Sequence, residues 1–201
     1  MSGGLYAFTN RYRNFIAQDL VVARTAAGPL AQSTNYAGVR ISGVEVSLDA
    51  PFTFERGVLT LTGSGALTRG TIKSGVDPLT GISLAGSPAD NITPSKVVAA
   101  ARWTEARGRW WLEYGVRGQG EVTRVAETLL ESPFLIAQDL LSLDAFAVHR
   151  LGAGMLLTRG GHRARLSVTV DNLTDAFYRE HFQFAPARGR SVAVGLSLGA
   201  F

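Results

Sequence analysis

The sequence has 201 residues, 46% of them hydrophobic and 18% charged, so its charge content is below the roughly 25% usual for soluble domains. Its net charge of +4 comes from 20 Lys and Arg residues scattered among 16 acidic ones, which argues against nucleic-acid binding. The absence of cysteine excludes disulfides and thiolate metal sites. The sequence contains no run of about 18 apolar residues, so no membrane-spanning helix is predicted.

Alternation of apolar and polar side chains predicts about eight β-strands. The first two are expected at 5–16 and 36–48, and a slip of phase near Ser42 and Gly43 predicts a β-bulge in the second. The third is expected at 57–68, with leucines on one face and small polar residues on the other. The remaining strands are expected at 96–104, 110–122, 146–157, 163–171 and 191–198.

The connections between these strands alternate in length. Short ones are expected at 49–57, 105–108 and 158–162, and long ones, rich in turn-forming residues, at 17–35, 69–94, 123–140 and 172–189. This alternation is typical of barrels with short periplasmic turns and long extracellular loops. Segments 127–146 and 173–182 can each also be drawn as an amphipathic helix, although Pro133 interrupts the first.

Charges occupy one face of several expected strands, and apolar side chains occupy the other. In a membrane barrel, the charges that would face the lumen are Glu113, Arg117, Glu121, Arg163, Arg165 and Asp171. Aromatic residues near strand ends, as expected at a lipid interface, are Trp103, Trp110, Trp111, Tyr178, Phe182 and Phe184. The pattern favours a transmembrane barrel, but a soluble β-barrel or sandwich that encloses an apolar ligand shows the same periodicity.

The sequence predicts no enzyme, no cofactor and no metal site. Residues 81–85 resemble a nucleophile elbow, but a proline soon follows where a helix should begin. His149, His162 and His181 are far apart and fall on different expected elements, so together they form no metal site. His181 lies beside Glu180 in a long loop, where contact with a metal-bearing cargo is a second interpretation.

Short motifs resemble those of one known family. Residues 172–178 (Asn-Leu-Thr-Asp-Ala-Phe-Tyr) resemble the N-L-x-D-x-x-Y segment that closes the penultimate strand of TonB-dependent outer-membrane receptors, and 187–191 resemble the start of their last strand. Segments 35–45 and 94–96 resemble two further strand motifs of the family. The positions that carry the resemblance are Asn172, Leu173, Asp175, Tyr178, Gly189, Arg190, Gly43, Glu45 and the terminal aromatic Phe201.

The resemblance implies an all-β, antiparallel transmembrane barrel segment, the C-terminal portion of a receptor, as a single unit over 1–201. It implies an integral protein of the bacterial outer membrane, with membrane lipid and the barrel insertion machinery as partners. In the intact receptor it implies active uptake of a scarce nutrient such as a ferric siderophore, haem or cobalamin. The TonB energy-coupling protein and the metal chelate or similar ligand would then be further partners.

The sequence also departs from the family pattern. No plug domain, TonB-engaging box or signal peptide is recognised, and about eight of about 22 barrel strands are expected. We therefore expect a receptor fragment that does not transport alone, whose strands either leave open edges or close into a small, filled barrel. A small porin-like structural barrel is a further alternative.

Overall fold

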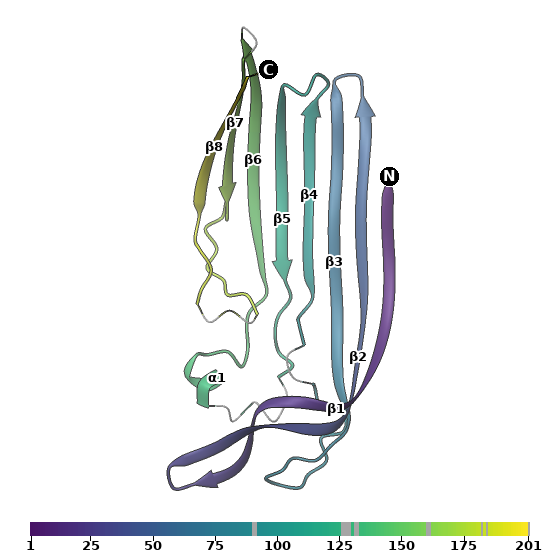
Figure 1. Ribbon diagram of the computed structural model, residues 1–201, viewed down its shortest axis with the longest axis vertical. Coiled ribbons are helices and arrows are strands. Elements are labelled where there is room, and N and C mark those ends of the chain that lie inside the picture. Colours follow the sequence, from purple (N-terminus) through teal and green to yellow (C-terminus); the bar gives the residue numbers. More distant parts are fainter. Residues whose placement is uncertain are drawn as a thin grey trace.

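The computed structural model describes residues 1–89, 92–125, 130, 133–159, 162–181, 183 and 185–200. Its strands form one antiparallel sheet in chain order from β1 to β8, which confirms the predicted fold class (Figure 1). A short helix, α1 (Pro133–Ala137), lies between β5 and β6. The strands are β1 (Ser2–Thr25), β2 (Gly28–Phe54), β3 (Gly57–Ser74), β4 (Lys96–Glu105), β5 (Trp110–Gln119), β6 (Phe146–Arg159), β7 (His162–Asp171) and β8 (Ser191–Ala200).

The connections fall into two classes at opposite ends of the sheet. The β2–β3 and β4–β5 turns lie at the upper end in Figure 1, which we call the turn end. The strand β6 ends and β7 begins at the same end. The β3–β4, β5–β6 and β7–β8 loops lie at the lower end, which we call the loop end, together with α1. In the β4–β5 turn, Gly108 adopts φ 68°, and Arg109 Nη2 donates a hydrogen bond to Glu105 Oε1 at 2.9 Å.

Residues 17–35, predicted as a long loop, instead extend the β1–β2 hairpin. Register shifts between Ala17 and Leu20 and between Val21 and Ala23 interrupt the ladder, and the hairpin bends across the loop end in Figure 1. The loop prediction was wrong because it followed the small and polar composition of this segment, whereas pairing and burial decide its structure. The buried cluster at the bend contains Ala17, Leu20, Val39, Ile72, Leu84 and Ala89.

The predicted β-bulge near Ser42 and Gly43 is wrong in position. Both ladders of β2 pass through these residues without a shift, and the irregularity of the β2–β3 ladder lies between Gly38 and Val39. Ser42 faces Thr9 across the β1–β2 ladder, and their hydroxyl oxygens are 2.9 Å apart. A hydroxyl pair on the face that carries Val44 and Val46 therefore imitates a break in the alternation.

The apolar side chains of the strands form an exposed face of the sheet. Because cross-strand partners share a face, Leu112 lies beside Trp103, and Val168 lies beside Val194. Leu112, Val168 and Val194 are 47%, 39% and 68% exposed, so they do not meet in a dry centre. An exposed apolar surface of this extent contradicts the soluble sandwich interpretation.

The sheet is open along both edges. Among the described residues, β1 pairs only with β2, and β8 pairs only with β7. The strands therefore do not close into the small barrel that the porin-like alternative requires.

Within the described part of the chain, no helix has the length and hydropathy needed to cross a membrane.

Candidate functional site on the polar face

The face opposite the apolar one, which we call the polar face, carries charges that pair across neighbouring strands. Arg102 in β4 and Glu113 in β5 are direct cross-strand partners, and Arg102 Nη1 donates to Glu113 Oε2 at 3.2 Å. The Arg102 guanidinium carbon also lies 4.0 Å from the centroid of the Trp111 ring. Arg150 in β6 and Asp171 in β7 form a second direct pair, with Nε and Oδ1 3.6 Å apart. Two arginines of the polar face are therefore neutralised by carboxylates of the neighbouring strand.

Arg117 joins the wall to the β7–β8 loop, in an arrangement that we call the loop latch (Arg117, Tyr178 and Glu180). Its Nη1 donates to the Glu180 carboxylate, and its Nη2 donates to the Tyr178 hydroxyl. Tyr178 is buried, and its ring centroid lies 4.4 Å from that of Phe146 at the start of β6. A single guanidinium thus holds two side chains of the loop against β5.

Gln119 and His181 make a second contact beside the loop latch. Gln119 is buried at the end of β5, and its Oε1 accepts a hydrogen bond of 3.1 Å from the His181 backbone N–H. Burial lowers the pKa of His181 below its usual 6.5, and the charge of Lys96 lowers this pKa further. The imidazole is therefore neutral at neutral pH. The adjacent Glu180 carboxylate is bonded to Arg117, which weighs against the pair as ligands of a cargo metal.

Asn172, the first residue of the C-terminal motif, organises the end of β7. It is 2% exposed and adopts φ 52°, in the left-handed region that asparagine tolerates. Its Oδ1 accepts from Ala176 N at 2.8 Å, and its Nδ2 donates to Ala176 O at 2.8 Å and to Arg188 O at 3.4 Å. The next residue, Leu173, donates its N–H to His149 O at 2.9 Å. The motif therefore closes the first turn of the loop and ties it to the segment before β8.

Asp175 extends this junction to the start of the last strand. Its Oδ1 accepts a hydrogen bond of 2.7 Å from Arg190 N. A Cβ atom at Gly189 would lie 2.9 Å from the same oxygen, so a side chain at this position would displace the carboxylate. Two motifs that are separate in the sequence thus form one structural unit, the β7–β8 junction (Asn172, Asp175, Gly189 and Arg190).

The remaining motif positions lie elsewhere. A Cβ atom at Gly43 would lie 2.6 Å from the Phe8 ring, so the glycine admits this ring on the polar face. Glu45 is exposed on the same face of β2, opposite Tyr6. Phe201 lies outside the described residues, as do Phe182 and Phe184 among the aromatic positions.

The predicted lumen-facing residues fall into two groups. Glu121 comes after the end of β5, on the rim of a hollow at the loop end. Sequence reasoning missed Arg102 and Arg150, and it named Glu180 only as the neighbour of His181. Strand register and loop path alone identify these residues as partners of the predicted charges. The polar face holds Glu113, Arg117, Arg163, Arg165 and Asp171.

In the described ranges, the histidines of the chain are not grouped with other metal ligands. The described part of the chain contains no group of three or more His, Cys, Asp or Glu residues placed to hold a metal ion. His149 Nδ1 lies 2.6 Å from the Tyr114 hydroxyl, and His162 is the first residue of β7. The three histidines therefore belong to separate environments.

Fold and site together define a segment of a β-barrel wall, with one exposed apolar face, one charged face and loops gathered at one end. A family model described as "TonB dependent receptor-like, beta-barrel" matches residues 2–173. The chain belongs to this family of TonB-dependent receptor β-barrels. No curated protein matches the sequence at a significant level.

Solved structures support the fold. The chain is similar to a structure titled "Copper transporter OprC", with a TM-score of 0.66 and 21% identity over 94% of this chain and 27% of that one. It is also similar to "The FrpB iron transporter from Neisseria meningitidis (F3-3 variant)", with a TM-score of 0.58 and 14% identity over 96% of this chain and 28% of that one. The chain therefore spans about a quarter of the length of either structure.

Proposed function

We propose that the chain is part of the wall of an outer-membrane uptake receptor, as a single unit over residues 1–201. The observation that carries this proposal is the division of the sheet into an exposed apolar face and a charged face with ion pairs between neighbouring strands. Strands β4, β5, β7 and β8 have 10 residues each, which matches the roughly 9–11 residues needed to cross a bilayer. In this proposal the protein is integral to the bacterial outer membrane, and it contacts lipid and the barrel insertion machinery.

The polar face would line the interior of the receptor. The paired charges on β4 to β7 would then contact water or a plug domain, and the loop latch would hold the β7–β8 loop over the lumen. This role requires no catalytic chemistry, so we propose a transport protein and no enzyme.

Active transport would require the intact receptor. An open sheet encloses no path, so the remaining wall, a plug and the TonB energy-coupling protein must complete it. The titles of the two similar structures, a copper transporter and an iron transporter, support a metal or metal chelate as cargo. A ferric siderophore, haem or cobalamin belongs to this class of scarce nutrient.

Adjacent residues on opposite faces of β8 test the sidedness of the wall. Val194 belongs to the apolar face and Ala193 to the polar face, and both side chains are exposed. In lipid vesicles, Val194→Arg should lower the free energy of unfolding by about 2–4 kcal/mol, because a guanidinium would lie among acyl chains. Ala193→Arg, the matched control, should cost about 1 kcal/mol or less, because it faces water.

Urea titrations of both variants in phosphatidylcholine vesicles, followed by tryptophan fluorescence, measure this difference. An equal loss in the two variants, or a larger loss for Ala193→Arg, would refute the proposed orientation. Correct folding of the chain as a monomer in plain buffer would refute the membrane location.

A further inference from the structure

A hollow of about 180 Å³ lies at the loop end, where β3 and β4 separate. Pairing between these strands ends at Ala66 and Lys96. Beyond this point, residues 67–70 of β3 form one side of the hollow, and residues 92–95 and 121–124 form the other. The hollow is separate from the loop latch, and the proposed function assigns it no role.

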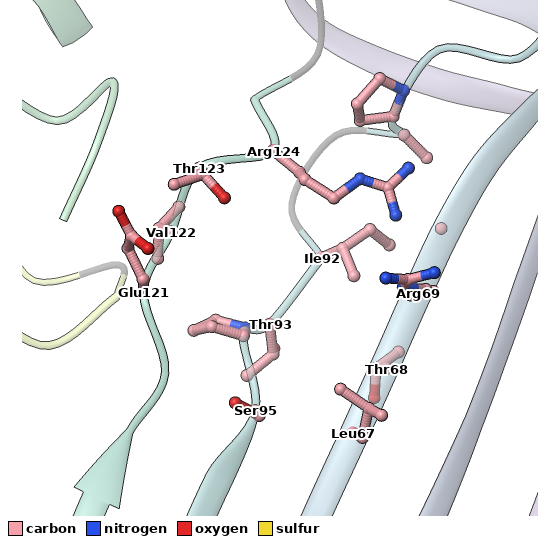
Figure 2. Close-up of a pocket in the computed structure, with 14 residues that line it drawn as sticks. Leu67, Thr68, Arg69, Ile92, Thr93, Ser95, Glu121, Val122, Thr123 and Arg124 are labelled. Atoms are coloured by element: carbon pink, nitrogen blue, oxygen red, sulfur yellow. The ribbon is translucent and has the colours of Figure 1, made fainter. Parts of the chain in front are cut away.

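Two arginines extend into this hollow from opposite sides. Figure 2 shows the guanidinium groups of Arg69, from β3, and Arg124, from the segment after β5, on the same side of Ile92. Within the described ranges, neither guanidinium makes a hydrogen bond or an ion pair. By contrast, a carboxylate pairs with each of Arg102, Arg109, Arg117 and Arg150.

The only carboxylate that lines the hollow among the described residues does not neutralise these charges. In Figure 2 the Glu121 carboxylate points away from both guanidinium groups. Thr123 adds a hydroxyl group to the same rim, and Ile92 and the buried Val122 supply apolar lining. Both arginine side chains are exposed and line the same hollow. Two like charges that face one hollow repel each other, and an anion between them would reduce this repulsion.

We propose that this hollow binds an oxyanion, such as a phosphate or carboxylate group, between Arg69 and Arg124. Planar guanidinium groups donate paired hydrogen bonds to both kinds of oxyanion, which gives the site its chemical selectivity. The oxyanion can belong to a soluble molecule or to a lipid headgroup. A lipid headgroup can reach the site because Arg69 lies on the apolar face, as does Leu67, two residues before it along β3.

Titration of the chain with inorganic phosphate in a non-ionic detergent tests the site. Calorimetry should detect one saturable site for phosphate. Arg69→Gln and Arg124→Gln should each weaken binding by about tenfold or more, the loss expected for one charge-assisted hydrogen bond. Glu121→Gln should strengthen binding, because it removes a negative charge from the rim.

Arg107→Gln is the matched control, because it removes the same charge from another exposed position that does not line the hollow, in the β4–β5 turn. Its affinity for phosphate should stay within about twofold of the wild type. Arg69→Lys keeps the charge but loses the paired donors, so it should bind more weakly than the wild type and more tightly than Arg69→Gln. Far-UV circular dichroism checks that each variant keeps its strands.

Absence of saturable phosphate binding by the wild type would overturn the proposal. Equal affinities of the Arg69→Gln, Arg124→Gln and Arg107→Gln variants would overturn it as well. Either failure would leave the receptor-wall proposal intact, because that proposal rests on the two faces of the sheet, which are tested on β8, and not on this hollow.

Lipid discs distinguish the two sources of the anion. In discs of phosphatidylcholine mixed with phosphatidylglycerol, a lipid ligand should compete with phosphate and weaken its apparent affinity relative to pure phosphatidylcholine discs. Arg69→Gln should abolish this difference. Unchanged affinity in the two kinds of disc would assign the site to a soluble anion.

Discussion

Replacing Asn172 with alanine should weaken the β7–β8 junction. The Asn172 side chain is 2% exposed and forms two hydrogen bonds of 2.8 Å with Ala176 and a longer one of 3.4 Å with Arg188 O. Loss of these partners at a buried position should cost about 1–3 kcal/mol. Alanine at φ 52° should add about 1 kcal/mol of backbone strain, so we expect a total of about 2–4 kcal/mol.

Asn172→Gly separates the two contributions, because glycine accepts this backbone conformation and loses the same hydrogen bonds. The glycine variant should therefore be more stable than the alanine variant by about 1 kcal/mol. Denaturant unfolding in non-ionic micelles gives the free energies, and hydrogen exchange at the Ala176 amide reports the local bond. An alanine variant within about 0.5 kcal/mol of the wild type, with unchanged exchange at Ala176, would refute this reasoning.

Two further perturbations test the loop end of the wall. Gly189→Ala should lower stability by about 1–3 kcal/mol, because its Cβ would lie 2.9 Å from a carboxylate oxygen. Gly63→Ala, where the nearest atom would be 3.6 Å away, is the control and should keep the wild-type unfolding midpoint; equal losses would contradict the argument. The NMR titration midpoint of His181 should lie below 6.5, and Lys96→Gln should raise it. Because the folded pKa is the lower one, the contribution of His181 to stability is complete above pH 6.5 and declines as the pH falls through the folded pKa. A wild-type midpoint at or above 6.5 would contradict this prediction.

Strand positions could be predicted because alternation is a local property. The strand expected at 163–171 is β7 (His162–Asp171), and the strand expected at 191–198 is β8 (Ser191–Ala200). The extension of the β1–β2 hairpin through 17–35 could not be predicted in the same way. Its strand structure depends on β-bulges and on burial against β3 and the β3–β4 loop, which no local pattern records.

The contacts of the candidate site also could not be predicted from local patterns. Alternation placed Arg117 among the charged positions of β5, but its partners Tyr178 and Glu180 lie 61 and 63 residues further along the chain. Asn172 was recognised as part of a motif, yet its role depends partly on Arg188, 16 residues away. Sequence patterns therefore singled out Arg117 and Asn172, and only the register and the loop path determine what each of them contacts.

The order of the sheet has a consequence for how such a wall is assembled. Every ladder from β1–β2 to β7–β8 joins strands that are consecutive in the chain. Each new strand therefore finds its partner close by, and the entropy lost at each step is that of closing a single connection. Growth one hairpin at a time leaves the outermost strand with unpaired amides and carbonyls at every stage. Until a further strand satisfies these groups, the same edges that let the wall grow also leave it open to pairing with a foreign chain.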